Sequence, residues 1–239
     1  MTAIGIIGGT AFKNLKDVEL NKRDISHTPW GTPSSPLYWG EMGGKEIVVI
    51  YRHGEKHDIP PQSVNTRANI YALRREVDTV IGISSAGALG KDMEVPSISV
   101  PQDYVNFWNI VSFYEQSIKH ITPGISSQLR EDLISASENI RDIPVRTEDI
   151  YVQTTGPRLE TRAEIRILQS YGDLVGMTMG SEATLCREAN VEYASLVTVD
   201  NYANGITDEA VRYDHIIENA ARSRGALLKI VETFLDQRG

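Results

Sequence analysis

Three short segments, each directly after an apolar run, carry residues that could bind an anion. Gly8-Gly9-Thr10 ends the run AIGIIGGT, Arg52-His53-Gly54 follows IVVIY, and Met177-Thr178 follows DLVG. The glycines let backbone N–H groups approach an anion closely, and the hydroxyl, guanidinium and imidazole groups add donors. Each segment alone is more typical of a tight turn or a solvated surface, but together they predict one phosphate bound at three strand ends. Their glycine spacing differs from that of dinucleotide-binding proteins.

A second group of residues has the features of a site for a flat base. The small residues Ser84-Ser85-Ala86-Gly87 follow a strand-like run and leave room for such a ligand. Glu160, in QTTGPRLETRAE, opens a predicted helix, and Asn201 follows another strand-like run in VTVDNYANG. Alternatively, Glu160 could be a first-turn carboxylate that stabilises the helix dipole, and Asn201 could be a turn residue after a strand.

Strand and helix patterns alternate along the chain and must position these residues. Apolar runs predict strands at 3–7, 47–51, 79–83, 98–100, 145–152, 174–177 and 193–199. Helical periodicity predicts helices at 62–76, 127–139, 161–171, 181–189 and 208–234. The alternation predicts an α/β fold, with a mainly parallel or mixed sheet covered by helices on both faces. Ligands of such sheets bind at strand carboxyl ends, where the three anion-binding segments fall.

Two longer segments, 26–36 and 103–123, have no regular pattern. The second contains Phe107, Trp108, Phe113 and Tyr114, so we expect it to pack against a partner subunit or to lie over a ligand. No repeat, low-complexity tract or linker interrupts the chain, and we expect residues 1–239 to form a single domain.

Composition narrows the possible partners. The 239 residues are 41% hydrophobic, enough for a sizeable core, and a formal net charge of −8 without a basic stretch argues against nucleic acid. No apolar stretch is long enough to span a membrane, and the N-terminus lacks the pattern of a signal peptide. The single cysteine, Cys186, fits a reducing compartment, so we expect a cytoplasmic location. HExxH and CxxC spacings are absent, and we expect no metal.

The motifs resemble those of the family that contains purine nucleoside phosphorylase and 5′-methylthioadenosine phosphorylase. The resemblance covers nearly the full length, through GIIGGT, RHGEKH, NTRANIYAL, SSAGALG, TTGPRLETRAEI, GMTMGSEATLCREANVEYASL and VDNYANG. It implies a three-layer α/β sandwich around a mixed sheet, active as a homotrimer or as a hexamer built from trimers. It also implies reversible phosphorolysis of an N-glycosidic bond, with inorganic phosphate as co-substrate and no cofactor.

By this resemblance, each candidate residue has an expected role. The expected phosphate ligands are Thr10, Arg52, His53, Ser85 and Thr178. The expected nucleoside contacts are Leu159, Glu160 and Asn201 at the purine, Met177 beneath the ribose, Tyr213 near the 5′ group and His120 from a neighbouring subunit. We expect Asn201 and His53 to act in catalysis, because negative charge builds on the leaving purine while phosphate attacks the sugar.

The base site combines features of two branches of the family. RHG and the TRAE helix are closer to the methylthioadenosine branch, which typically has serine at position 160 and aspartates at 201 and 203. This chain instead has Glu160, Asn201 and Ala203, of which the first two are similar to the 6-oxopurine enzymes. Asn201 can donate to O6 and an ionised Glu160 can accept from N1–H, whereas adenine offers the opposite polarity. Gly180-Ser181 before Glu182 also departs from the family's usual Pro-Glu pair.

We therefore predict an enzyme of purine salvage that cleaves 6-oxopurine nucleosides: inosine, guanosine or 5′-methylthioinosine. The alternatives are a 5′-methylthioadenosine phosphorylase that tolerates Asn201 and a non-catalytic nucleotide-binding module. Tyr213 could pack against a methylthio group or bond a hydroxyl, and the nearby Ile217 is apolar, so the sequence leaves the 5′ preference open.

Overall fold

Four parallel strands form the centre of the sheet. The computed structural model describes residues 3–12, 19–23 and 27–238. Ser26, the first residue of the predicted irregular segment 26–36, and the two ends of the predicted domain 1–239 lie outside the described residues. The central strands are β4 (Lys45–Tyr51), β1 (Ile4–Gly8), β5 (Thr79–Ala88) and β11 (Glu192–Tyr202). Their nearly continuous apolar sequences are typical of strands covered on both faces.

Shorter strands extend the sheet on both sides. They are β2 (Asn21–Arg23), β3 (Leu37–Met42), β6 (Ser97–Ser99), β7 (Asp103–Val105), β8 (Val145–Arg146), β9 (Ile150–Gln153) and β10 (Leu174–Gly176). β3 and β2 lie beyond β4; β10, β9 and β7 follow from β5; and β6 and β8 continue from β11.

The edge of β5 that pairs with β1 changes partner part-way along. β1 pairs with β5 as far as Gly82 of β5, and β10 pairs antiparallel with β5 from Gly87 onward. β11 pairs with β5 over the whole strand. Between Gly82 and Gly87 the sheet therefore forks, and within the described residues no strand pairs with this stretch on the β1 side.

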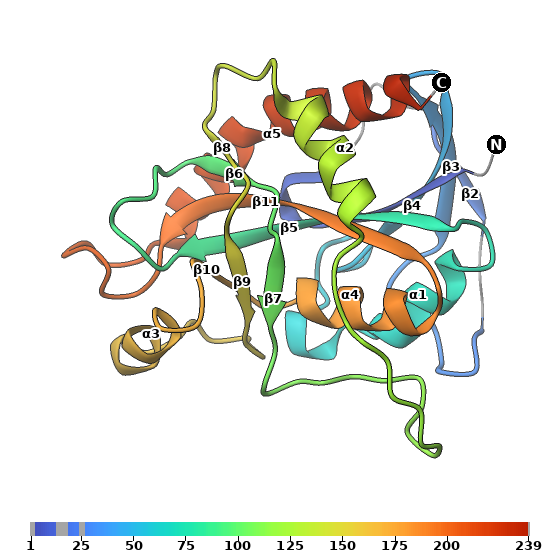
Figure 1. Ribbon diagram of the computed structural model, residues 1–239, viewed down its shortest axis with the longest axis horizontal. Helices are drawn as coiled ribbons and strands as arrows, with labels where there is room; N and C mark the ends of the chain where they lie inside the picture. The colour runs from blue at the N-terminus through green and yellow to red at the C-terminus, as the bar shows by residue number, and fades with distance from the viewer. Residues whose placement is uncertain (1–2, 13–18, 24–26, 239) are drawn as a thin grey trace.

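Helices cover both faces of the sheet (Figure 1). α2 (Ser127–Ser137) and α5 (Tyr213–Gln237) lie on one face, and α1 (Thr66–Leu73) and α4 (Met179–Glu188) lie on the other. Each pair contributes to its own apolar core cluster against the sheet. α3 (Arg162–Leu168) packs on a smaller cluster with β9 and β10, and two short 3-10 turns, η1 (Thr10–Phe12) and η2 (Pro61–Ser63), follow β1 and β4. The predicted three-layer α/β sandwich with a mixed sheet is confirmed.

Most predicted elements occur, with shifted ends. The range 145–152 is two strands rather than one, because β8 pairs with β6 whereas β9 pairs with β10 and β7. An ion pair of 2.8 Å between Arg146 and the buried Asp149 lies at the turn between them. The apolar runs do not predict β2, β3 or β7, and the last helix begins at Tyr213 rather than at 208. Among the described helices, none combines the length and the apolar character needed to cross a membrane.

Candidate functional site

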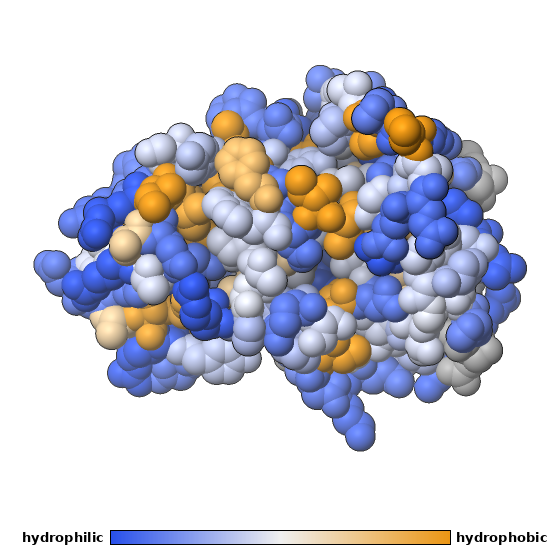
Figure 2. Space-filling view, turned by 90° about the horizontal axis from the view of Figure 1, so that it is seen from below, coloured by the Kyte–Doolittle hydropathy of each residue, from blue (hydrophilic) through white to orange (hydrophobic). Residues whose placement is uncertain are grey.

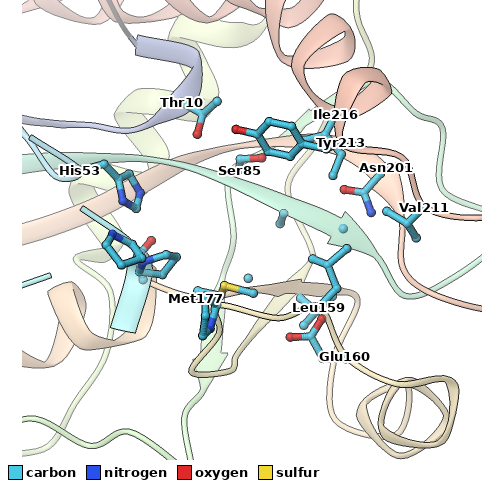
Figure 3. A pocket seen from close by; sticks show the side chains of 18 of the residues that line it. Thr10, His53, Ser85, Leu159, Glu160, Met177, Asn201, Val211, Tyr213 and Ile216 are labelled. Carbon is cyan, nitrogen blue, oxygen red and sulfur yellow. The ribbon is translucent and has the colours of Figure 1, made fainter. Parts of the chain in front are cut away.

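A cavity of about 580 Å³ lies where the sheet forks. It is lined by all but one of the site residues predicted from the sequence: Thr10, Arg52, His53, Ser85, Leu159, Glu160, Met177, Thr178, Asn201 and Tyr213. Figure 3 shows His53 and Thr10 toward one end, Asn201, Leu159 and Glu160 toward the other, and Met177 between them. The two predicted groups, one for an anion and one for a base, therefore share one cavity.

Arg52 forms part of the cavity wall and is fixed by a buried ion pair. Its side chain is 1% exposed. Nε and Nη2 donate to the two carboxylate oxygens of Glu182, the second over 3.0 Å, and Nη1 donates to the Ile83 carbonyl over 2.8 Å. Burial opposes the charge, but contact with Glu182 outweighs it and raises the pKa of Arg52. The guanidinium is therefore a fixed positive charge beside the cavity.

Gly9 lets Arg52 reach this position. A Cβ at residue 9 would lie 2.6 Å from Arg52 Nη1 and 2.5 Å from the Ile83 carbonyl oxygen, so only glycine leaves enough room. Gly8 and Gly9 line a neighbouring hollow rather than this cavity. Their structural role is thus close packing behind the end of the cavity that is predicted to bind an anion, whereas Thr10 reaches the cavity itself.

Two histidines lie at the same end of the cavity. His53 Nδ1 is 2.8 Å from the Ile59 carbonyl oxygen. Because a carbonyl only accepts, Nδ1 carries a proton, and Nε2 can accept from a ligand or, when protonated, donate to it. His57, for which the sequence predicted no role, also lines the cavity; its Nε2 is 3.4 Å from Thr10 Oγ1 and its ring centroid is 4.8 Å from that of His53.

The start of α4 brings Thr178 to the cavity. Tyr151 Oη accepts from the Thr178 backbone N–H over 3.3 Å, and Thr178 Oγ1 is 3.4 Å from Ser84 Oγ. The departure from the family's Pro-Glu pair has a local explanation. Ser181 exchanges two hydrogen bonds with Gln153, at 2.6 and 2.9 Å, and a Cβ at Gly180 would lie 2.9 Å from the Tyr104 ring. The sequence Gly180-Ser181 therefore forms a well-packed helix start.

Glu160 lies at the end of the cavity that is predicted to bind a base, where its neighbours hold it in place. Its side chain is 8% exposed, and Oε1 accepts from Thr154 Oγ1 over 2.5 Å. The Glu160 carbonyl accepts from Asn204 Nδ2 over 3.0 Å. α3 begins directly afterwards with a reciprocal capping box between Thr161 and Glu164. These contacts give the carboxylate a fixed place, with Oε2 available to a ligand.

Asn201 lies beside a flat, open stretch of β5. Its Nδ2 donates one of two amide hydrogens to the Tyr202 carbonyl over 2.9 Å. A Cβ at Gly87 would lie 3.2 Å from this nitrogen and 3.6 Å from the backbone of Ala203. Glycine at 87 and alanine at 203 thus leave space next to the amide, as expected for a planar ligand.

The remaining predicted residues differ in exposure. Leu159 and Tyr213 line the cavity but are 48% and 70% exposed, so they lie at its mouth. His120 does not line it. The segment that follows β7 and contains His120 runs away from the body of the protein before it reaches α2 (Figure 1). The expected role of His120 in the site of a neighbouring subunit stays a prediction.

Two buried carboxylates next to the cavity were missed by the sequence prediction of site residues. Glu182 holds Arg52 and also accepts from Tyr193 Oη over 2.8 Å. Asp200 accepts from Ser85 Oγ and from Thr198 Oγ1, the latter over 2.8 Å. Burial raises the pKa of Asp200 to about 6, although the two hydroxyl donors lower it. A charged residue directly after the apolar run 193–199 was the available signal for Asp200, whereas Glu182 lies in the mixed sequence GSEATLC, which offers no such signal. Within the described part of the chain, no group of His, Cys, Asp and Glu side chains could hold a metal ion.

Comparisons with known proteins identify the family of this chain. The model of the "Phosphorylase superfamily" matches residues 3–236. A "Probable 6-oxopurine nucleoside phosphorylase" of Archaeoglobus fulgidus is 44% identical over 96% of this chain and 94% of the relative. A "Probable S-methyl-5'-thioinosine phosphorylase" of Methanocaldococcus jannaschii is 35% identical over 98% of this chain and 92% of the relative. A solved methylthioadenosine phosphorylase from Schistosoma mansoni, in complex with adenine, superposes with a TM-score of 0.87 at 28% identity, covering 100% of this chain and 92% of that one. This chain therefore belongs to the phosphorylase superfamily.

Proposed function

We propose that this chain is a pentosyltransferase that cleaves 6-oxopurine nucleosides reversibly with phosphate. The products are a free purine and ribose 1-phosphate, or its methylthio analogue, in purine salvage. The pairing of Asn201 with Glu160 in one cavity carries the proposal, because their polarities match a 6-oxopurine. The name of the Archaeoglobus fulgidus relative, 44% identical to this chain, supports it.

The anion end of the cavity would hold phosphate beside the sugar. Arg52 supplies a fixed charge, His53 can donate through Nε2 when protonated, and Thr10, Thr178 and Ser85 supply hydroxyl groups. Holding phosphate and nucleoside in one orientation lets the anion attack C1′ from the face opposite the purine. Inorganic phosphate is the co-substrate, and the reaction as proposed requires no metal or organic cofactor.

The base end would stabilise the leaving purine. As the C1′–N9 bond breaks, the ribose gains positive charge and the purine gains negative charge. The Asn201 amide can donate to O6 while its carbonyl accepts from a protonated N7. Glu160 Oε1 is occupied by Thr154, so Oε2 is the atom that would accept from N1–H. Adenine has a bare N1 and a 6-amino donor, so both contacts would have the wrong polarity.

The 5′ end admits more than one substrate. Val211, Tyr213 and Ile216 line the cavity near Asn201 and supply apolar surface as well as a phenol. We propose inosine, guanosine or 5′-methylthioinosine as the substrate, with 5′-methylthioadenosine as the alternative. 5′-Methylthioadenosine remains the alternative substrate because solved proteins of similar fold carry the name methylthioadenosine phosphorylase.

Steady-state kinetics with four nucleosides tests the proposal. We expect kcat/KM for inosine, guanosine or 5′-methylthioinosine to exceed that for 5′-methylthioadenosine. The ratio for paired 6-oxo and 6-amino nucleosides with the same sugar should be on the order of tenfold to several thousandfold. Asn201→Asp should reduce this ratio, Glu160→Ser should weaken oxopurine cleavage, and Glu148→Gln at the exposed surface is the control. A wild-type preference for the 6-amino member would establish the methylthioadenosine alternative, and cleavage of none of them would leave only a nucleotide-binding module.

We further propose a cytoplasmic homotrimer or hexamer. Phe107 is 60% exposed and Trp108 52% exposed, and they stack edge-on with centroids 5.5 Å apart. Such side chains favour burial against another copy. The segment after β7 extends downward in Figure 1. Figure 2 shows the molecule from that side, where apolar side chains lie among polar ones on the surface. The lone Cys186 is a buried free thiol, in keeping with a reducing compartment.

A further inference from the structure

Asp200 is a buried carboxylate that the proposed mechanism does not use. It is the extra residue of a bulge in β11, because Val199 pairs with Ala86 and Asn201 pairs with Gly87. Its side chain is fully buried and does not line the cavity. Ser85 lies in the middle of β5 between buried residues, is partly exposed, and does line the cavity. Asp200 can therefore act on a ligand only through Ser85.

The contact with Asp200 sets the polarity of the Ser85 hydroxyl. Ser85 Oγ donates to Asp200 Oδ2, to which Thr198 Oγ1 also donates over 2.8 Å. Asp200 Oδ1 has no hydrogen-bond partner among the described residues. A serine hydroxyl has one proton, so Ser85 presents only lone pairs to the cavity while it donates to Asp200. A bare oxyanion oxygen would be repelled there, whereas a P–OH group could donate.

We propose that Asp200 is a positioning residue that makes Ser85 the acceptor for the proton of inorganic phosphate, so that the site favours phosphate over sulfate. Sulfate has the same shape but carries no proton at neutral pH. The inference rests on the proposed phosphate site and is independent of which purine or 5′ group the enzyme accepts.

The surroundings of Asp200 give this preference a defined pH dependence. Burial raises its pKa to about 6. Among the described residues, β5 faces it with Ser85, β11 with Thr198, and α5 with Asn219, which donates to the Asp200 carbonyl over 2.8 Å. The charged neighbours of Asn219 on α5, Glu218 and Arg222, are exposed. The titratable groups that line the cavity beyond Ser85 are those of Arg52, His53, His57, Asp58, Glu160 and Tyr213.

Protonation of Asp200 would reverse the polarity of the pair. The carboxyl would donate to Ser85 Oγ, and the Ser85 hydrogen would turn to the cavity, where it can donate to sulfate as well as to phosphate. Phosphate should thus be preferred above about pH 6, where Asp200 is ionised, and the preference should fade below it.

Calorimetric titration with phosphate and with sulfate, without nucleoside, tests the proposal between pH 5 and pH 8. In wild type we expect a phosphate preference on the order of tenfold at the high end, falling toward equality at the low end. Ser85→Ala should show little preference at any pH. Asp200→Asn should show a preference without a transition near pH 6, because the amide oxygen accepts from Ser85 throughout. Thr198→Val, which removes the other donor, should keep the transition but move it to higher pH.

Comparison between variants isolates the effect of Asp200, because the titration of phosphate itself is common to all of them. Circular dichroism verifies that each variant is folded, and Ser85→Ala tests the polarity even if Asp200→Asn does not fold. The proposal is wrong if wild type binds sulfate as tightly as phosphate at pH 8, if Ser85→Ala keeps the preference, or if Asp200→Asn keeps the wild-type transition. Failure of the proposed function looks different: the preference would be present while no purine nucleoside is cleaved.

Discussion

Replacing Glu182 by glutamine should destabilise the protein strongly, because it leaves the Arg52 guanidinium buried without a counter-charge. Both side chains are nearly inaccessible, at 1% for Arg52 and 2% for Glu182. Removing one partner of such a pair costs about 3–5 kcal/mol, a large share of a typical free energy of unfolding of about 5–15 kcal/mol. For a chain of this size, that corresponds to a fall in Tm on the order of 10 °C.

A double variant separates stability from function. Arg52→Met combined with Glu182→Leu removes both charges, and apolar replacement of a buried ion pair is often close to neutral. The remaining loss should come from two groups that lose a hydrogen-bond partner, at about 1–3 kcal/mol each. They are the Tyr193 hydroxyl, which donates to Glu182 over 2.8 Å, and the Ile83 carbonyl, which accepts from Arg52 Nη1 over 2.8 Å. Removal of the cost of burying two charges offsets part of this loss. We therefore expect the double variant to be more stable than Glu182→Gln but to have lost most of its affinity for phosphate.

Chemical denaturation and thermal melting of the wild type and both variants are the measurements. Glu148→Gln is the control, because the Glu148 side chain is 81% exposed and its contact with Arg130 is long, at 3.8 Å, so it should change stability little. If Glu182→Gln unfolds at the wild-type denaturant concentration, Glu182 does not compensate the charge of Arg52. If the double variant is the less stable of the two, the ion pair contributes more to the free energy of unfolding than the burial of its two charges costs, and the expectation above is wrong.

Three further outcomes are expected. Gly87→Ala places a Cβ 3.2 Å from Asn201 Nδ2, so kcat/KM for nucleosides should fall while the KM for phosphate stays near wild type in initial-rate assays. Burial raises the pKa of the Cys186 thiol well above its usual range, so a thiol reagent should label it in guanidinium but not in the native protein; rapid native labelling would contradict its placement. Mixing inactive His120→Ala and Arg52→Ala chains should restore some activity if subunits share sites, and a wild-type monomer that is active in sedimentation experiments would refute the shared site.

The clustering of the anion-binding segments could be predicted because β1 and β4 are apolar parallel strands whose carboxyl ends meet. Thr10 and Arg52-His53 follow from that rule alone. Met177-Thr178 does not, since β10 runs antiparallel to β5. It joins the others because β5 extends beyond β1 and pairs with β10 further along, and strand length of this kind depends on partners that a local pattern does not specify.

The two missed carboxylates depend on contacts between distant parts of the chain. Glu182 meets Arg52 across 130 positions of sequence, and nothing near either residue indicates the other. Asp200 is buried because β11 bulges at this point and continues to Tyr202, past the predicted end at 199. Its role depends on the register between two strands, which the hydrophobic pattern leaves undetermined.

The fork in the sheet leaves a short stretch of the β5 edge without a strand partner among the described residues. An open strand edge normally invites another strand, and proteins usually cover it or charge it. Here the open stretch of β5 between Gly82 and Gly87 is enclosed by β1 and β10, too short for another strand, and one of its carbonyls is occupied by Arg52. The same stretch lines the cavity of about 580 Å³ through Ser85, Ala86 and Gly87. The gap in strand pairing and the proposed site are therefore formed by the same residues, and a strand that closed the gap would also close the site.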